Sequence, residues 1–287
     1  MRGNLRVPPS LAWHVFSIVP WRAEGSVTER VAPNVDRRGI AMEDSEHPRA
    51  PEQRGATERR PLVDRAEAGI QLAARLGHLR GQNPLVIGLA RGGMPVAREV
   101  ARQLDADLDV LVVRKLGAPG QPELAIGALA ADGTYYLNRE LVVQLGISDA
   151  SIERTAELQR GEALRFEQML RGGRPPIETG GRTVILVDDG LATGMTMRVA
   201  VHATAHHWPK RLIVAVPVAA SETCRELAPL VDELVCLNQA DSFRAVGDYY
   251  AHFDPTTDVQ VLDALRQRHA RCASCAGLRV GEGRGVP

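Results

Sequence analysis

The chain has 287 residues, which allows one large domain or two small ones with a sizeable buried core. Lysine plus arginine and aspartate plus glutamate balance at 35 residues each, so no net charge draws the chain to nucleic acid or to an anionic membrane. No apolar run reaches the length of a membrane span. These bounds favour a globular protein with a buried core.

Residues 1–57 carry no periodic apolar pattern. They mix proline, glycine, arginine and acidic residues, which predicts a disordered extension, or an upstream region that is not translated if Met42 is the true start. Residues 11–21 are apolar enough to suggest a signal peptide, but His14 and Pro20 interrupt them. We therefore expect a cytoplasmic protein.

A folded domain is predicted over residues 58–268, and it opens with a helix. Asp64 suits the N-cap position of that helix because its side chain can accept a hydrogen bond from the first turn. The helical period predicts one inward face, made of Ala66, Gly69, Ile70, Ala73 and Leu76.

Residues 84–90 predict the first core strand. Arg91, Gly92 and Gly93 follow it, and a helix opens at Pro95, which is a favoured residue in a first helical turn. A glycine-containing turn between a strand and a helix N-terminus can hold an anion. This turn is the first candidate anion site.

A second strand is predicted at residues 108–113, with Arg114 and Lys115 at its carboxyl end. Two cations there suit a ligand with several negative charges, although a solvated strand end would look the same. The next stretch, residues 117–124, is rich in glycine and proline and predicts a mobile loop, with Glu123 as its only acidic residue.

Residues 126–137 predict a hairpin that turns at Asp132 and Gly133. Charged helical segments follow at residues 138–145 and 152–170 and end at two glycines. We expect a helical insertion over about residues 138–175, which covers the domain or contacts another subunit.

The most informative stretch is residues 184–196. Four apolar residues predict a strand buried on both faces, and Asp188 and Asp189 stand where it ends. A loop of small and hydroxyl residues leads into a helix near Thr196. The first N–H groups of that helix lack intrahelical partners and favour a phosphate. The two carboxylates would repel this phosphate unless they contact hydroxyls or a cation, so a ligand with a phosphate, a diol and a bound metal fits.

Other interpretations of this stretch are weaker. A Walker B strand would require a G-x-x-x-x-G-K-[ST] segment, which the sequence lacks. A receiver domain would need a lysine on a later strand, and Lys210 is the only lysine after the stretch. A purely structural Asp-Asp turn stays open.

Strands at residues 211–218 and 231–237 alternate with a helix at residues 222–227. This alternation predicts an α/β fold: a mostly parallel, twisted, Rossmann-like sheet flanked by helices, with the helical insertion and a small hood or lid. Ligands then bind beyond the carboxyl ends of the strands.

Several residues at the end of the domain invite a functional or a structural interpretation. Four of the eleven aromatic residues fall within residues 243–253, as a base-stacking loop or as a packed edge. A closing helix is predicted at residues 257–268, with Val259, Leu262 and Leu265 facing inward, and residues 269–287 are expected to form a disordered tail. His202 and His206 have metal-ligand spacing without a third ligand, and Cys272 and Cys275 lack a second cysteine pair, so we predict no metal held by side chains alone.

The stretch at 184–196 resembles the signature of type I phosphoribosyltransferases, which has an apolar strand, an acidic pair and a Thr-Gly-x-Thr loop. With the segments around Arg65, Arg91, Lys115, Glu123 and Val246, the chain is similar to a bacterial subgroup of that family over residues 58–268. The resemblance implies that the substrate is phosphoribosyl pyrophosphate (PRPP), that Mg²⁺ binds through the substrate, and that the protein is a homodimer.

The resemblance also implies residue roles. Asp188 and Asp189 would bind the ribose hydroxyls, and the loop would bind the 5′-phosphate through Gly190, Ala192, Thr193, Gly194, Met195 and Thr196. Arg91, Gly92, Gly93, Arg114 and Lys115 would bind pyrophosphate. Lys115 would also stabilise the leaving group catalytically, and Glu123 would polarise the acceptor, which is a nitrogenous base or a similar molecule. A PRPP-sensing regulator and a nucleoside-phosphate hydrolase or phosphorylase stay open as alternatives.

Overall fold

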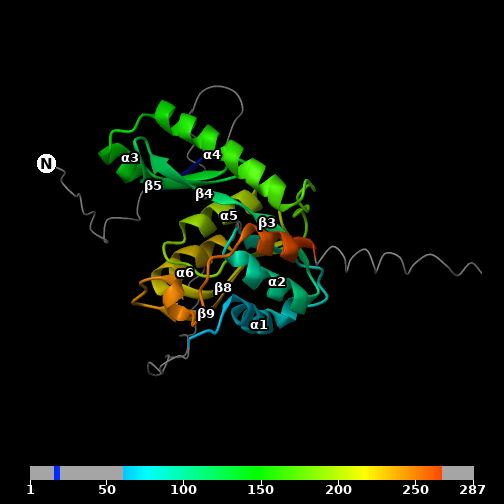
Figure 1. Cartoon of the computed structure of the whole chain (residues 1–287). Coiled ribbons are helices and arrows are strands. Elements are labelled where there is room, and N and C mark those ends of the chain that lie inside the picture. The colour runs from blue at the N-terminus through cyan, green and yellow to red at the C-terminus, as the bar shows by residue number, and fades with distance from the viewer. Residues whose placement is uncertain (1–15, 20–60, 267–287) are drawn as a thin grey trace, which may run out of the picture.

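A parallel sheet of five strands lies at the centre of the molecule, in the order β3-β2-β7-β8-β9 (Figure 1). The computed structural model describes residues 16–19, by their backbone, and residues 61–266. All neighbouring pairs in this sheet are parallel. The strands are β2 (Leu85–Leu89), β3 (Asp107–Leu111), β7 (Thr183–Val187), β8 (Arg211–Ala220) and β9 (Glu233–Ala240).

Helices cover both faces of this sheet, which is why every residue of β2 and β7 is buried. One face packs against α1 (Arg65–Arg75), α2 (Gly93–Leu104) and the helix at residues 258–266. The other face packs against α5 (Met195–Ala205) and α6 (Ser221–Leu227). The predicted α/β fold with a mostly parallel sheet is therefore confirmed. Short 3-10 turns at η1 (Gly77–Leu79), η2 (Ala228–Leu230) and η3 (Val246–Tyr249) complete the connections.

Two predicted helix faces were partly wrong. Asp64 caps α1 as expected, accepting from the N–H of Glu67 at 2.8 Å. However, Ile70 is exposed, and Leu72 occupies the buried position in its place. In the helix at residues 258–266, the inward side chains are Val261, Ala264 and Leu265, while Val259 is exposed. In both stretches apolar residues occur on more than one face of the helix, so the helical period alone does not decide which face is buried.

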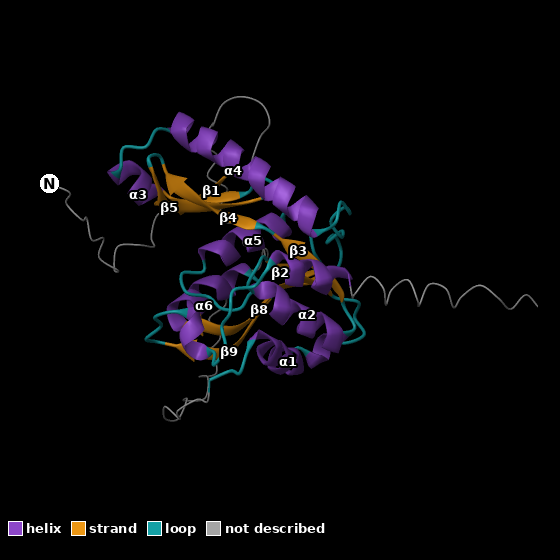
Figure 2. Cartoon of the chain, in the orientation of Figure 1, coloured by secondary structure: helices purple, strands orange, loops and turns teal. Residues whose placement is uncertain are grey.

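A second, antiparallel sheet stands on α5 (Figures 1 and 2). Its order is β1-β6-β5-β4, and its strands are β1 (Phe16–Val19), β4 (Val113–Ala118), β5 (Gln121–Ala130) and β6 (Tyr135–Asn138). One face packs on α5 through Ala128, Ala130 and Tyr136. The other face is covered by α3 (Arg139–Gln144) and α4 (Asp149–Leu170), which form the predicted insertion. The layers thus alternate between helix and sheet from α4 down to α1.

The region around residue 112 differs from the prediction. A single strand was expected over residues 108–113, but β3 ends at Leu111 and the chain enters β4, which belongs to the other sheet. Arg114 and Lys115 therefore lie inside an antiparallel strand, opposite Leu129 and Ala128, and not at a parallel strand end. An unbroken β-rich sequence gives no local sign that the chain changes sheets there.

The predicted loop at residues 117–124 is the far end of the β4–β5 hairpin. Ala118 pairs with Gln121 across a turn of Pro119 and Gly120, and the register shifts at Gly117. The β5–β6 hairpin turns at residues 131–134, as predicted, and Asp132 accepts from the N–H and the hydroxyl of Thr134. The glycine and proline residues thus mark a hairpin turn and a bulge.

A buried charge cluster joins α4 to the edge strand β3. Arg171 donates to Asp109 Oδ1 at 2.8 Å, to Glu167 Oε1 at 2.5 Å and to the carbonyl of Val110 at 2.7 Å. The carboxylates also accept from main-chain N–H groups, including that of Val112 at 2.9 Å. Each charge therefore has several partners, and the cluster fixes the insertion against the parallel sheet.

Only part of the predicted N-terminal extension is described. Residues 16–19, expected to be disordered, form β1, which pairs with β6 from Phe16 opposite Asn138 to Val19 opposite Tyr135. The rest of the extension, with Met42, and the tail at 269–287, with Cys272 and Cys275, lie outside the described residues. Across the ranges that are described, no helix has both the length and the apolar character needed to cross a membrane.

Candidate active site

The acidic pair lies where β7 ends, at the carboxyl edge of the parallel sheet. Asp188 Oδ1 accepts from the main-chain N–H of Asp189 at 2.9 Å. Asp189 Oδ2 accepts from Arg65 Nε at 2.8 Å, and both side chains of that ion pair are more than four-fifths buried. The main-chain carbonyl of Asp189 accepts from the hydroxyl of Tyr250 at 2.7 Å. The pair is therefore held in place before any ligand arrives.

The electrostatics of the pair are unfavourable without a ligand. Burial raises the pKa of Asp188 well above its usual range, and the neighbouring Asp189 raises it further. Burial also raises the pKa of Asp189, although the Arg65 guanidinium opposes this shift. Two buried carboxylates side by side are stabilised by hydroxyl donors or by a cation. The geometry thus supports the sequence argument for a diol or a metal at this position.

The glycine turn after β2 lies directly against the acidic pair, because β2 and β7 are neighbouring parallel strands. A Cβ atom on Gly92 would stand 2.8 Å from Asp189 Cγ, and one on Gly93 would stand 2.8 Å from Asp188 Cα. A side chain at position 92 would displace the Asp189 carboxylate, and one at position 93 would clash with the backbone of residues 187–188. The two predicted ligand loops therefore meet at one edge, as expected from the sequence.

Arg91 is turned away from the acidic pair. Its Nε forms an ion pair with Asp258 at 2.8 Å, and its guanidinium lies 5.4 Å from the ring of Phe166 on α4. About half of the Arg91 side chain is exposed. This arginine thus links α4 to the closing helix.

The loop between β7 and α5 is clamped to β8. The N–H of Leu191 donates to the carbonyl of Val218 at 2.9 Å, and the hydroxyl of Thr223 donates to the carbonyl of Ala192 at 2.7 Å. Gly190 packs against Val218 and Val246, where a Cβ atom would clash. The loop therefore has a fixed backbone in front of the α5 N-terminus.

The N-terminus of α5 has the features of an anion site. Gly194 is the N-cap residue, with a left-handed φ of 67°, and within residues 61–266 no side chain caps the helix. The first N–H groups, beginning with Met195 and Thr196, are therefore left for a ligand or water. Thr193 is exposed beside them, and Thr196 is half-buried.

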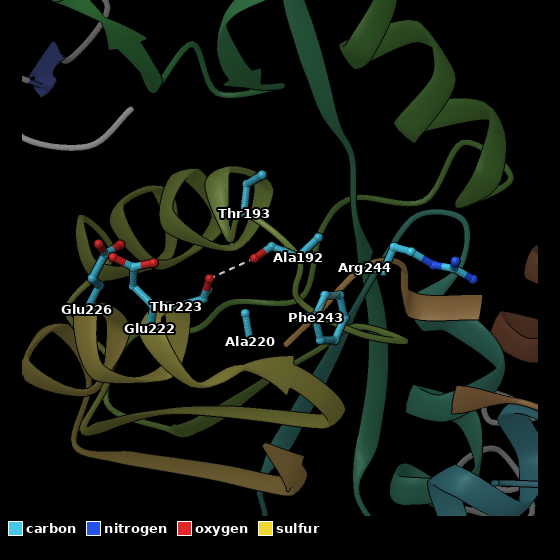
Figure 3. A pocket seen from close by; sticks show the side chains of 8 residues that line it. All are labelled: Ala192, Thr193, Ala220, Glu222, Thr223, Glu226, Phe243 and Arg244. Atoms are coloured by element: carbon cyan, nitrogen blue, oxygen red, sulfur yellow. Dashed lines mark hydrogen bonds between the residues drawn. The ribbon is translucent and has the colours of Figure 1, made fainter. Parts of the chain in front are cut away.

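A pocket of about 250 Å³ opens beside this loop (Figure 3). Its lining comes from the loop, from the β8–α6 junction and from the segment after β9, and the side chains are Ala192, Thr193, Ala220, Glu222, Thr223, Glu226, Phe243 and Arg244. Glu222 and Glu226 lie at one end of the pocket, while Phe243 and Arg244 lie at the other. The Phe243 ring stacks on Tyr249, with centroids 5.1 Å apart and planes 16° apart. The aromatic cluster at residues 243–253 thus supplies one ring, Phe243, to the pocket wall, and Tyr249 stacks on that ring.

The cations of β4 and the acid of β5 lie on the hairpin, apart from the acidic pair. Arg114 donates to Gln159 at 2.9 Å and pairs with Glu162 at 2.8 Å, both on α4. Lys115 is exposed, and because side chains alternate along a strand it points to the α5 side of the sheet, as Val113 does. Glu123 is exposed near the hairpin turn. Lys115 therefore lies on the side of the sheet away from α4, whereas Arg114 is held by α4.

Sequence reasoning assigned no site role to Arg65. This residue starts α1 and reaches Asp189 because residues 62–63 form main-chain hydrogen bonds with residues 249–252, such as that from Ala251 to Leu62 at 2.7 Å. The segment that follows supplies Phe253, whose ring centroid lies 3.8 Å from the Arg65 guanidinium carbon. These partners are more than 120 residues away in sequence, so no local signal shows that Arg65 contacts the acidic pair.

His202 and His206 gain no third ligand in the structure. The described residues contain no group of three histidine, cysteine, aspartate or glutamate side chains that could hold a metal ion. His206 Nδ1 lies 3.5 Å from the hydroxyl of Thr134, and burial lowers the pKa of His202 to about 4. His202 is therefore a partly buried residue of α5, and His206 is an exposed residue at the helix end, beside the β5–β6 turn.

A model of the phosphoribosyl transferase domain matches residues 64–254, which is most of the described chain. This chain belongs to the phosphoribosyltransferase family. The match spans both ligand loops and the whole parallel sheet, so the resemblance seen in the signature is confirmed.

Individual proteins are also similar to this chain over most of its length. Two Mycobacterium tuberculosis proteins, from strains CDC 1551 and H37Rv, are provisionally named phosphoribosyl transferases and are 41% identical over 215 residues. The alignment covers 75% of this chain and 48% of theirs, so this chain spans about half the length of those curated relatives. The crystal structure of TT1426 from Thermus thermophilus is 41% identical, with a TM-score of 0.62, over 72% of this chain and 98% of that chain.

Proposed function

We propose that the protein transfers the phosphoribosyl group of PRPP to a nitrogenous base, or to a similar acceptor, and releases pyrophosphate. One observation carries the proposal: the acidic pair touches the glycine turn and stands beside the uncapped N-terminus of α5. A single sheet edge thus offers groups for a diol, a pyrophosphate and a monophosphate. PRPP carries these three groups around one ribose ring.

The donor would lie across this edge. Asp188 and Asp189 accept from the ribose hydroxyls, and the main chain of the loop from Gly190 to Thr196 donates to the 5′-phosphate. The turn at Gly92 and Gly93 receives the pyrophosphate, because its main chain can approach without side chains in the way. The two anionic groups of PRPP are thus assigned to the two loops whose main-chain N–H groups can stabilise negative charge.

The cations would act on the leaving group. Lys115 faces the α5 side of its sheet and is free to extend, and Arg91 is half exposed on the glycine turn. Arg114 must leave Glu162 on α4 before it can join them. Because Lys115 and Glu123 lie on the β4–β5 hairpin, we expect them to contact ligands when that hairpin closes over the donor and excludes water.

Magnesium fits this site when it is held chiefly by substrate oxygens. The described residues form no cage of protein ligands, but two buried carboxylates with raised pKa values adjoin the place of the pyrophosphate. A magnesium ion bound there would neutralise part of the negative charge of the pyrophosphate. Asp188 and Asp189 would stabilise the positive charge that develops on the ribose at C1.

The acceptor would bind in the pocket beside the phosphate loop. Ala192 and Thr193 line the pocket and also belong to the loop proposed to bind the 5′-phosphate, so a molecule in the pocket would lie next to the donor. Phe243 supplies an aromatic ring in the wall, which suits stacking on a flat heterocycle. Together these features support a heterocyclic base as the acceptor.

The test is to incubate the full chain with Mg²⁺, PRPP and a panel of purine, pyrimidine and pyridine bases, and to measure pyrophosphate. We expect release with at least one base, and Asp189→Asn should lower turnover by about 10²–10³-fold while the melting temperature is kept. Tight PRPP binding without pyrophosphate from any base would instead support a sensor. Absence of PRPP binding at millimolar concentration would refute the proposal.

A further inference from the structure

Arg65 lies between the acidic pair and the C-terminal segment of the domain. Its Nε donates to Asp189 Oδ2 at 2.8 Å, and its Nη1 donates to the main-chain carbonyl of Asp254 at 2.7 Å. The guanidinium carbon is 3.8 Å from the centroid of the Phe253 ring. The side chain is only 11% exposed. Arg65 is therefore immobilised by three different partners before a ligand binds.

The charges around Asp189 are unequal. Asp188 on β7 is its neighbour and would share a proton with it, because two adjacent buried carboxylates do not both ionise readily. Asp64 adds a further negative charge at the start of α1, and Tyr250 contributes a hydroxyl bonded to the Asp189 carbonyl. Arg65 brings a positive charge into direct contact with the pair. It contacts Asp189 and not Asp188, so it favours the state in which Asp189 is ionised and Asp188 carries any proton.

The geometry calls for a guanidinium and not merely for a positive charge. One flat group donates in two directions and also lies over the Phe253 ring, whereas a lysine ammonium would supply charge without the fixed plane. The orientation of the Asp189 carboxylate is thereby set by an anchor that the C-terminal segment holds. A carboxylate in a fixed orientation binds a diol at a lower entropic cost than a mobile one.

We propose that Arg65 is a positioning residue of the donor site, which keeps Asp189 ionised and oriented for the ribose hydroxyls of PRPP. This inference rests on the proposed function for the identity of the ligand. The contact between Arg65 and Asp189 is itself independent of that identity. The segment with Phe253 and Asp254 acts on the donor through Arg65.

The first measurement is calorimetric titration of the full chain with PRPP and Mg²⁺ between about pH 5 and pH 9. Arg65→Met should weaken PRPP binding at least about 10-fold at neutral pH and move the acid limb of the binding profile to higher pH. Compared with Arg65→Met, Arg65→Lys should recover part of the PRPP affinity, and the acid limb of its binding profile should lie close to the wild-type pH. Arg182→Met is the matched control, because Arg182 pairs with Asp107 at 2.8 Å at the opposite edge of the sheet. It should leave both quantities at wild-type values.

The second measurement needs no ligand. Carboxylate titration by ¹³C NMR of aspartate-labelled protein should show a raised pKa of Asp189 in Arg65→Met relative to the wild type, and melting temperatures identify variants that are folded. An unchanged Asp189 titration, or a loss of PRPP affinity that is equal at all pH values, would overturn the inference. Tighter PRPP binding by Arg65→Met would also overturn it, since Arg65 would then compete with the donor. If the wild type binds no PRPP, the proposed function fails, while the NMR result still decides the effect of Arg65 on Asp189.

Discussion

Gly92→Ala isolates the contact between the two ligand loops. Gly92 has helical backbone angles, φ −57° and ψ −37°, so alanine meets no conformational penalty there. The new Cβ atom, however, would stand 2.8 Å from Asp189 Cγ. Ordinary contact between carbon atoms is about 3.5–4.0 Å, so the carboxylate must retreat by about 1 Å. That shift also strains its 2.8 Å hydrogen bond to Arg65.

A misplacement of about 1 Å in a positioned group costs on the order of 10²-fold in rate. We therefore expect Gly92→Ala to lower pyrophosphate release by about that factor and to weaken PRPP binding, with little change in melting temperature. Calorimetry and a pyrophosphate assay measure the two effects. Gly161→Ala on α4 is the control, because its Cβ atom finds nothing closer than 3.5 Å, and it should raise stability by up to about 1 kcal/mol with unchanged activity. Wild-type PRPP affinity in Gly92→Ala would show that the two loops do not act on one ligand.

Three further predictions concern buried charges. Asp188→Asn should raise the free energy of unfolding of the ligand-free protein at neutral pH. The raised pKa means that the folded state resists ionisation, so the gain should vanish as pH falls below about 4, and a denaturant titration without such a gain would contradict the assigned burial. Arg171→Met leaves the carboxylates of Asp109 and Glu167 buried without their cation and should cost about 3–5 kcal/mol of stability; a cost under about 1 kcal/mol would mean that the cluster does not hold the insertion. Since the folded pKa of His202 is about 4, the unfolded chain binds its proton first, and stability should fall by up to about 3 kcal/mol between pH 7 and pH 4. His202→Gln should remove most of that fall, and an unchanged pH dependence would rule out this histidine as its source.

The two candidate ligand loops could be located from the sequence because their signals are local. The apolar run of β7, the acidic pair after it and the glycines of both loops each specify a strand end or a close approach over a few residues. Parallel alternation then places both loops at one edge of the sheet, which the Gly92–Asp189 and Gly93–Asp188 approaches confirm.

Only the tertiary structure decided how that edge is completed. The sequence shows no sign that the chain leaves one sheet at Val112 for another, so the environment of Arg114 and Lys115 could not be predicted from β-propensity. Likewise, Arg65 meets Asp189 because main-chain pairing brings residues 62–63 to residues 249–252, across most of the domain. Local patterns specify where strands end and which turns admit an anion, whereas the partner of a buried charge is chosen by packing between segments far apart in the chain.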